Sequence, residues 1–378
     1  MHRREHRTTI VTDAISCVVC SGTRFNRLAD PHADRCIASD LRVLAEPLDK
    51  WQCLTCGAIR RGRMLAPEAL FTSDYDLYAH DPGRVEEARR QAGYAAWLAA
   101  VLPVPVSVYE AGSGNGSLLL SLRERWSNAA MSGIEPAGDA AAAARRAGLN
   151  VATGFLREAQ AGTERASLAV CVNVIEHTPE PVTFLRALAS HGESVAIVCP
   201  DATIPNAELL FGDHIHSLRP RHLEALFAQA ALDVDEVTFA PASLGHFQLV
   251  VGHRSSRPSA GDARAAVDDR HSRYLEAWRG LDRVLLERTG GERTIAFGAG
   301  EAAGLLRAYA PVTWSNVAAC AVDAPDTNRF GELAVLDASS LEACTVLLAV
   351  RPAAQAAVAE RLHERGHRVV RWDDVIQA

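Results

Sequence analysis

The sequence of 378 residues predicts an α/β protein with a doubly wound, Rossmann-like core. Three observations support this fold class: a strand, glycine turn and helix pattern around residue 110, two Cys-x-x-Cys pairs within the first 60 residues, and a second α/β pattern after residue 290. The hydrophobic content of 48% and the charged content of 22% are those of a globular protein. This chain length favours two or three domains.

The glycine turn is the most informative segment of the sequence. The β-branched, apolar run Val104–Tyr109 predicts a strand, and the leucines from Leu118 predict a helix. Between them stand Glu110 and glycines at 112, 114 and 116, which let a backbone pass close to a ligand. The helix N-terminus beyond them offers unpaired N–H groups. A dinucleotide-binding fingerprint would place its third glycine at Ser117, so the spacing differs from that motif.

Further strands follow in an order that suits the same fold. We expect strands at Met131–Glu135, Ser167–Val172 and Ser194–Pro200, each followed by a loop. Ligands of open α/β sheets bind at the carboxyl ends of the strands. Glu135 ends the second strand, where an acid accepts hydrogen bonds from ribose hydroxyls.

The pattern acid-x-Gly-x-Gly-x-Gly resembles motif I of class I S-adenosylmethionine (SAM) methyltransferases, and the segment Asn173–Pro181 resembles their V-L-E-H segment with its proline-bearing loop. The resemblance implies that the glycine loop holds the methionine end of SAM, Glu135 the ribose, and residues near Phe155 the adenine. A Rossmann-like sheet that binds no SAM, and a core role for Phe155, are the alternatives. The expected cofactor-binding residues are Glu110, Gly112, Gly114, Gly116, Glu135, Pro136, Gly154, Phe155 and Asn173.

Four cysteines form the second strong motif. Cys17 and Cys20 make one Cys-x-x-Cys pair, Cys53 and Cys56 make another, and 32 residues separate the two pairs. Four thiolates close the shell of a tetrahedral ion, which predicts a structural Zn²⁺ rather than a catalytic one, and an inserted hairpin would accommodate the long spacing. Cys36 and His32 are less favoured ligands. Two incidental pairs, or a redox motif, are the alternatives, although redox pairs occur in a βαβ context that this segment lacks.

The last hundred residues start a second α/β pattern. The segment Thr294–Gly304 predicts a strand, a glycine turn and a helix, and we expect further strands at Val317–Val322, Cys344–Val350 and Arg368–Trp372. The spacing of its glycines at 298, 300 and 304 differs from that of the dinucleotide-binding fingerprint. We therefore favour a Rossmann-like domain without a second cofactor, and a second cofactor site is the alternative.

The charge and the cysteine usage limit the partners and the location. The net charge is −7 and the isoelectric point is near 6.1, which argues against a nucleic-acid surface. No apolar run reaches the length of a membrane span, and the basic start is not followed by an apolar core. Nine cysteines without an export signal suggest reduced thiols. We expect a cytoplasmic protein that binds a small molecule, and the sequence does not predict its oligomeric state.

These motifs divide the chain into three modules. We expect a zinc-ribbon-like module at 1–66, a class I SAM methyltransferase (Rossmann-like) core with an entry helix at 67–252, and a linker helix with a C-terminal Rossmann-like α/β domain at 253–378. This ordered set resembles the sugar C-methyltransferases of deoxysugar biosynthesis over almost the whole chain. The shared motifs include the cysteine pairs, Asp74–Tyr78, Glu176–His177 and Gly298–Gly300.

The resemblance implies methylation of a carbon beside a ketone on a nucleotide-linked sugar. The catalytic base of that family is a histidine in a Tyr-x-Glu-His segment, and His214 falls on it. Asp213 replaces the Glu, and Phe211 replaces the Tyr and has no hydroxyl to stabilise an enolate. His216 is the substitute for that role. Histidine suits a base because its pKa lies near neutrality.

Other roles for these residues stay open. His214 can position substrate instead of taking a proton, and His177 can simply bond to backbone. We expect Tyr75, Tyr78, Glu176 and His177 to contact substrate, although both tyrosines can equally pack at a domain seam. The sequence thus predicts a keto-deoxysugar C-methyltransferase in natural-product biosynthesis. The alternatives are an O- or N-methyltransferase of another small metabolite, which needs only an aligned nucleophile, and a non-catalytic binding protein.

Overall fold

The computed structural model describes residues 10–11, 16–63, 70–71, 85–160, 162–256, 263–264 and 266–376. Two compact units are present. The first comprises Met1–Arg27, Lys50–Leu209 and Asp213–Asp268, and the second comprises Leu28–Asp49, Leu210–Gly212 and Asp269–Ala378. No helix in the described part of the chain is long and apolar enough to cross a membrane. The three-module division expected from the sequence stays a prediction.

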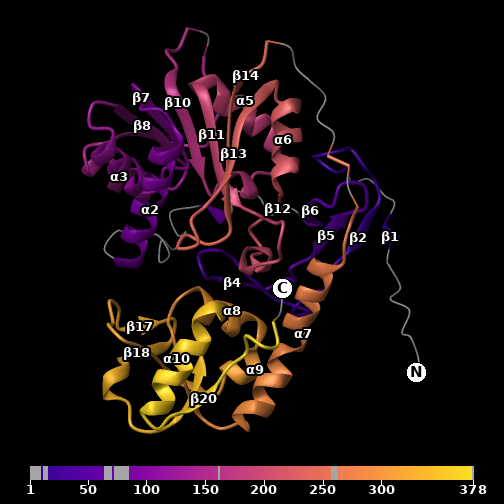
Figure 1. The fold of residues 1–378 in the computed structure, drawn as a ribbon, viewed down its shortest axis with the longest axis vertical. Helices are drawn as coiled ribbons and strands as arrows, with labels where there is room; N and C mark the ends of the chain where they lie inside the picture. The colour runs from indigo at the N-terminus through magenta and orange to yellow at the C-terminus, as the bar shows by residue number, and fades with distance from the viewer. Residues whose placement is uncertain are drawn as a thin grey trace. The chain divides into compact units, whose positions relative to one another are not determined.

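A seven-stranded sheet forms the centre of the first unit, with the order β13-β14-β11-β10-β7-β8-β9 (Figure 1). Strands β11, β10, β7, β8 and β9 are parallel, β14 runs antiparallel to β11, and the edge strand β13 runs antiparallel to β14. The strands are β7 (Ser107–Ala111), β8 (Ala130–Glu135), β9 (Asn150–Thr153), β10 (Ala166–Val172), β11 (Gly192–Pro200), β13 (Leu232–Phe239) and β14 (Phe247–Arg254).

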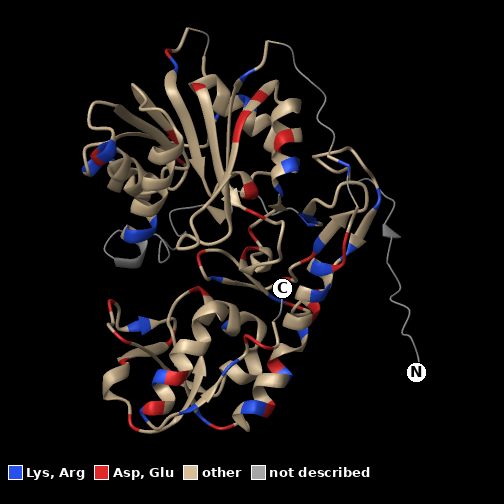
Figure 2. Ribbon diagram, in the orientation of Figure 1, with Lys and Arg blue, Asp and Glu red and all other residues tan. Residues whose placement is uncertain are grey.

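Helices connect these parallel strands, as the alternating sequence pattern predicts. They are α2 (Val85–Val101), α3 (Ser117–Arg125), α4 (Gly138–Arg146), α5 (Pro181–His191) and α6 (Pro220–Gln229), with short 3₁₀ turns η2 (Ile175–His177) and η3 (Ala207–Leu210). One apolar cluster joins α2 and α3 to the sheet, and another joins α5 and α6. Because both faces are covered, the central strands carry few charged residues, as Figure 2 shows for β10 and β11. The Rossmann-like core is confirmed.

The first central strand begins later than the sequence suggests. The apolar run from Val104 predicts a strand, but β7 starts at Ser107. Val104 and Val106 are 75% and 79% exposed, so they add nothing to the core. Pro103 and Pro105 cannot donate ladder hydrogen bonds, which explains the late start.

A smaller antiparallel sheet in the same unit carries the cysteine pairs. Its order is β1-β2-β5-β6-β12, and the last strand comes from the segment after His214 rather than from the N-terminal module. Strand β12 pairs with β6 through His216 and Arg60. The N-terminal strands therefore bind directly to a loop of the methyltransferase-like core. The strands are β1 (Ile10–Val11), β2 (Phe25–Arg27), β5 (Lys50–Cys53), β6 (Ile59–Arg61) and β12 (His216–Ser217).

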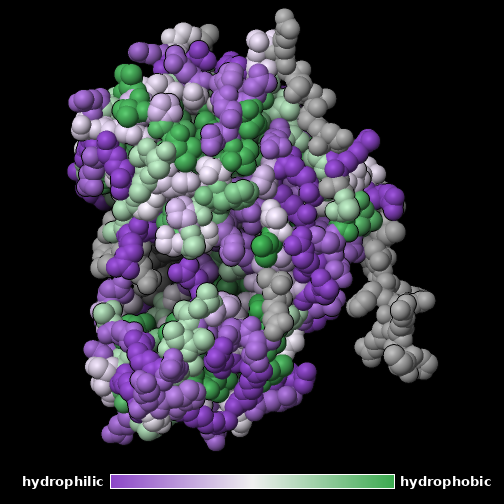
Figure 3. Space-filling view, in the orientation of Figure 1, coloured by the Kyte–Doolittle hydropathy of each residue, from purple (hydrophilic) through white to green (hydrophobic). Residues whose placement is uncertain are grey.

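The second unit contains a six-stranded sheet with the order β17-β18-β16-β15-β19-β20. Its strands are parallel except for β17. They are β15 (Thr294–Phe297), β16 (Val317–Val322), β17 (Arg329–Phe330), β18 (Leu333–Asp337), β19 (Thr345–Leu348) and β20 (Arg368–Val370). The second α/β domain is thus confirmed, and β17 with β18 are strands that the sequence reading missed. On the face that Figure 3 shows, the surface of this sheet unit is mostly hydrophilic.

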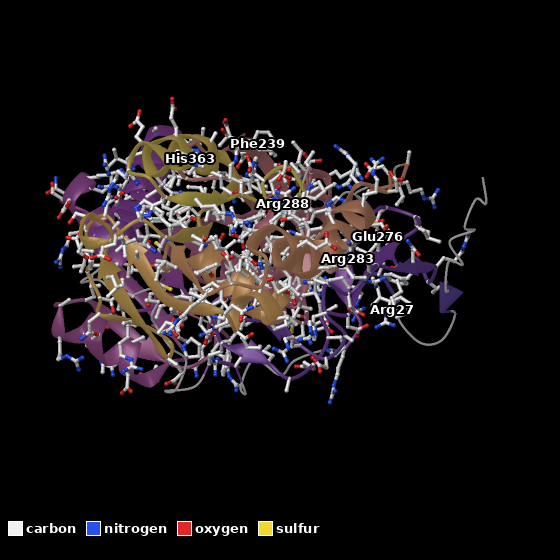
Figure 4. All side chains as sticks on the ribbon, turned by 90° about the horizontal axis from the view of Figure 1, so that it is seen from below. Arg27, Phe239, Glu276, Arg283, Arg288 and His363 are labelled. Atoms are coloured by element: carbon white, nitrogen blue, oxygen red, sulfur yellow. The ribbon has the colours of Figure 1, made fainter. Side chains whose placement is uncertain are left out.

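The helices of the second unit include one long amphipathic helix, α7. They are α7 (Arg270–Thr289), α8 (Glu301–Tyr309), α9 (Pro311–Trp314) and α10 (Pro352–Glu364), with a 3₁₀ turn η4 (Ala338–Ser340). Helix α7 buries Trp278 against Trp372, with ring centroids 5.4 Å apart. Its other side is charged: Arg283 pairs with Glu287, Arg288 pairs with Asp374, and Figure 4 labels both arginines.

The long spacing between the two cysteine pairs is explained within this second unit. Residues 28–49 form an antiparallel hairpin of β3 (Cys36–Ile37) and β4 (Val43–Leu44), as the sequence predicts. Its Leu41 carbonyl accepts a hydrogen bond from Arg307, and Ile37 forms a bridge to Phe211. Cys36 and His32, the less favoured metal ligands, therefore belong to the second unit, whereas all four paired cysteines belong to the first.

Candidate functional site

The glycine loop between β7 and α3 adopts the left-handed backbone conformation that favours glycine. Gly112, Gly114 and Gly116 have φ of +73°, +54° and +83°. A Cβ on Gly112 would lie 2.5 Å from Val174, and one on Gly116 would lie 2.3 Å from Leu149. A Cβ on Gly114 would meet nothing within 4 Å. The outer glycines are thus required for packing, and Gly114 faces the open side where a ligand can approach the backbone.

Two buried carboxyl groups flank this loop. Glu110 is 3% exposed, and its Oε2 has no hydrogen-bond partner among the described residues. Burial, together with the nearby charge of Glu135, raises the pKa of Glu110 well above its usual range. Glu135 accepts hydrogen bonds of 2.8 Å from the backbone N–H groups of Gly114 and Ala137. The carboxylate of Glu135 therefore fixes the loop against the end of β8.

The remaining expected cofactor residues lie at the same carboxyl ends of the strands. Asn173 follows β10 and has a φ of +56°, a strained value for a residue other than glycine. Gly154 follows β9 and donates a hydrogen bond of 2.9 Å to the backbone carbonyl of Glu135. Phe155 is 37% exposed, which leaves its ring accessible. Pro136 is half-buried after β8. This edge of the sheet has the exposed ring, the open glycine and the buried carboxyls that an adenosyl ligand needs.

The four paired cysteines converge as their spacing predicts. The Sγ atoms of Cys17 and Cys56 are 3.6 Å apart, as are those of Cys20 and Cys53, and all four sulfurs lie within 4.8 Å of one another. Four sulfurs at 2.3 Å from a tetrahedral ion would be about 3.8 Å apart. Contacts with the Cys17 and Cys56 thiols hold the pKa of Cys53 far below its usual range. No cysteine is in a disulfide. The donor set fits a tetrahedral metal.

A second polar cluster lies near the carboxyl end of β10. Glu176 and His177 of η2 meet His214 so that their ligand atoms lie within 4.8 Å of one another. The two imidazole rings are edge-to-face, with centroids 4.7 Å apart. The ring of Phe71 packs on His177 at 5.3 Å. All three members of the cluster are less than 8% exposed.

Other groups hold these histidines in place. Nδ1 of His177 bonds to the backbone carbonyl of Asp213 at 2.9 Å, and the Asp213 carboxylate lies 3.8 Å away. Nδ1 of His214 lies 3.3 Å from the carboxylate of Glu208. The ammonium of the buried Lys50 donates a hydrogen bond to the backbone carbonyl of His214. Burial, His177 and Lys50 lower the pKa of His214 well below 6.5, so its imidazole is neutral at pH 7.

The comparisons with known proteins agree with this geometry. A family model described as a methyltransferase domain matches residues 86–237, the segment that contains the glycine loop and Glu176. The protein is a SAM-dependent methyltransferase. Its class I domain supplies the fold that the glycine motif predicts.

Solved structures are similar to this methyltransferase at low identity. Magnesium protoporphyrin IX methyltransferase from Synechocystis is 18% identical, with a TM-score of 0.36 over 45% of this chain and 84% of its own. A mitomycin 7-O-methyltransferase is 17% identical, with a TM-score of 0.39 over 48% and 60%. A methyltransferase from Streptomyces caelestis is 13% identical, with a TM-score of 0.36 over 48% and 96%. The search of curated proteins found no match.

The structure of the methyltransferase places most of the expected site residues. His177, Asp213 and His214 lie together, and His216 is buried in β12, where burial lowers its pKa to about 4. Tyr75 and Tyr78 fall outside the described residues. The sequence reading missed Lys50, Glu208 and Phe71 because each is distant in sequence or lies in a stretch without a motif. Isolated residues of this kind give no signal until the fold brings them to the histidines.

Proposed function

We propose that this enzyme methylates the carbon beside a ketone of a nucleotide-linked keto-deoxysugar. The observation that carries the proposal is a buried, neutral His214 backed by the carboxylate of Glu208 at 3.3 Å. A neutral imidazole in a buried site accepts a proton, and a carboxylate at its other nitrogen stabilises the imidazolium that forms. This pairing resembles the histidine and carboxylate of the sugar C-methyltransferases, although the carboxylate here is that of Glu208.

The proposed reaction breaks one C–H bond and forms one C–C bond. His214 takes the proton α to the ketone, and the electron pair of the broken C–H bond forms an enolate on the substrate. Bound SAM supplies the methyl group and leaves as S-adenosylhomocysteine. Glu110, the glycine loop, Glu135, Pro136, Gly154, Phe155 and Asn173 are proposed to bind SAM. The neighbouring His177 and Asp213 are proposed to orient the acceptor, and His216 to act near the enolate.

Zinc is the proposed ion of the four-cysteine cluster. The sulfur spacing of 3.6 Å and the set of four thiolates suit a structural Zn²⁺. The ion would not take part in methyl transfer. It would hold β5 and β6 in the sheet that continues into β12, next in sequence to His214.

Methylation of an oxygen or nitrogen atom of another small metabolite is the second candidate. Phe211 favours it, because this residue stands where the sugar enzymes carry Tyr, and it is 2% exposed and without a hydroxyl. An O- or N-nucleophile needs alignment with the methyl group and no enolate stabilisation. The loss of the tyrosine would therefore matter less to such a reaction.

Proton NMR in D₂O tests the two candidates. The protein is mixed with S-adenosylhomocysteine and a panel of nucleotide-linked keto-deoxysugars, and loss of the proton α to the ketone is followed. We expect enzyme-dependent exchange that vanishes in His214→Ala and persists in His253→Ala, whose histidine is half exposed on β14. No exchange with any sugar, while calorimetry still shows SAM binding, would move the assignment to O- or N-methylation.

A further inference from the structure

Glu176 is a buried carboxyl group in the 3₁₀ turn η2. It is 2% exposed, and neither side-chain oxygen has a hydrogen bond among the residues that the structure describes. Buried carboxyl groups in proteins are paired with a cation, hydrogen-bonded or bound to a metal. Glu176 is also one of the residues that the sequence predicts to contact substrate.

The two histidines beside it have the surroundings of metal ligands. A metal-bound imidazole commonly donates its other N–H to a carbonyl or a carboxylate, which fixes the tautomer. Nδ1 of His177 meets the Asp213 carbonyl at 2.9 Å, and Nδ1 of His214 lies 3.3 Å from the carboxylate of Glu208. A hydrogen on each Nδ1 leaves the lone pair of each ring on Nε2.

We propose that Glu176, His177 and His214 bind a divalent transition-metal ion at a site separate from the four cysteines. Their ligand atoms lie within 4.8 Å of one another, so small side-chain rotations bring all three to a common ion. Two imidazoles and one carboxylate form the facial ligand set that Fe²⁺ and Mn²⁺ accept, with coordination positions left for water or acceptor oxygens. Four thiolates, in contrast, select Zn²⁺ and leave no position open.

The ion and the proposed base role use the same lone pair of His214. A bound ion therefore competes with the α-proton. The exchange experiment above is run on chelator-treated enzyme, so that metal binding does not interfere with the base role of His214. The metal inference does not rest on the keto-sugar assignment, because metal binding is measured without any acceptor. Failure of either experiment leaves the other interpretable.

Manganese binding to the full-length protein tests the site. Mn²⁺ is the probe because hard ions bind thiolates poorly, so it avoids the four cysteines. The chelator-treated protein is titrated with Mn²⁺, and free ion is followed by electron paramagnetic resonance, with zinc content recorded throughout. We expect one Mn²⁺ per chain, bound without loss of zinc. Loss of one ligand in Glu176→Gln should weaken binding by more than about 100-fold.

Glu180→Gln is the matched control, since Glu180 is exposed and lies four residues further along the same segment. It should bind Mn²⁺ as the unaltered protein does. Pulsed paramagnetic resonance of the unaltered protein gives a second readout, which needs no variant to fold: two imidazole nitrogens should couple to the ion. The absence of Mn²⁺ binding in protein that still binds SAM, equal affinity in Glu176→Gln, or no imidazole coupling would each overturn the proposal.

Discussion

The imidazole of His222 joins helix α6 to the second cysteine pair. Its Nε2 donates a hydrogen bond of 2.9 Å to the backbone carbonyl of Cys56, and its Nδ1 accepts one of 3.1 Å from the backbone N–H of Arg219. Both ring nitrogens are thereby satisfied in the neutral form. The guanidinium of Arg221 donates to the same Cys56 carbonyl at 3.0 Å. The cysteine cluster is thus bonded to the helix that follows the His214 loop.

Replacing His222 by Leu should destabilise the fold. The buried N–H of Arg219 loses its partner, whereas the Cys56 carbonyl keeps Arg221. An unsatisfied buried group costs about 1–3 kcal/mol, so we expect a fall of that size in the free energy of unfolding. Urea titration measures it. His253→Leu, at a half-exposed site, should change stability by less than about 0.5 kcal/mol. Equal losses in the two variants would contradict this assignment.

Removing the zinc ion proposed for the cysteine cluster should loosen the segment that carries His214. Cys20→Ser takes away one of four ligands, and elemental analysis should show loss of zinc. Because β6 pairs with β12, amide hydrogen exchange should rise at residues 213–217 as well as at 50–61. Cys320→Ser, a buried cysteine outside the cluster, should keep its zinc. Unchanged exchange at 213–217 in zinc-free protein would show that the strand pairing does not depend on the ion.

Alanine substitutions at two glycines with similar backbone strain distinguish an effect on cofactor binding from an effect on stability. Gly114 and Gly148 both have positive φ, and a Cβ on either meets nothing within 4 Å. Alanine at either position should cost roughly 1–2 kcal/mol of stability. Only Gly114→Ala should weaken SAM binding, since the added methyl group occupies the open side of the loop. Calorimetric titration with SAM and thermal melting provide the two readouts. A similar loss of SAM affinity in both variants would attribute the effect to the fold alone.

Glu110 should make the SAM-free protein less stable as the pH rises. Its pKa is raised in the folded state, so its contribution is complete below the unfolded value near 4.5 and is lost as the pH rises through the folded value. The slope is about 1.4 kcal/mol per pH unit for one group. Glu110→Gln removes this group, so the variant should gain stability relative to the unaltered protein between pH 5 and pH 8.

Urea titrations at pH 5, 6.5 and 8 measure the difference for Glu110. Glu124→Gln is the control, because Glu124 is an exposed residue on α3 and should leave the pH dependence unchanged. Parallel stability curves for Glu110→Gln and the unaltered protein would mean that the carboxyl is not buried in the neutral form.

The sequence predicted the glycine loop and the cysteine cluster because both are local patterns. Glycines at alternate positions after a strand admit few backbone conformations, and paired cysteines carry their ligand geometry in their spacing. The predicted start of β7 was too early, because the apolar run from Val104 includes residues that the neighbouring prolines keep out of the sheet. Strands β13 and β14 were not predicted, and β14, whose first six residues are buried, lies between β11 and β13.

What the sequence determined by itself is the identity of the methyltransferase core and the donor set of its cysteine cluster. Only the tertiary structure decided that residues 28–49 belong to the second unit, that β12 completes the cysteine-bearing sheet, and that Glu208 rather than a motif residue backs His214. Local motifs are encoded by a few neighbouring residues. Contacts between segments more than a hundred residues apart, such as that of Lys50 with the His214 carbonyl, arise from burial and strand pairing that no short window contains.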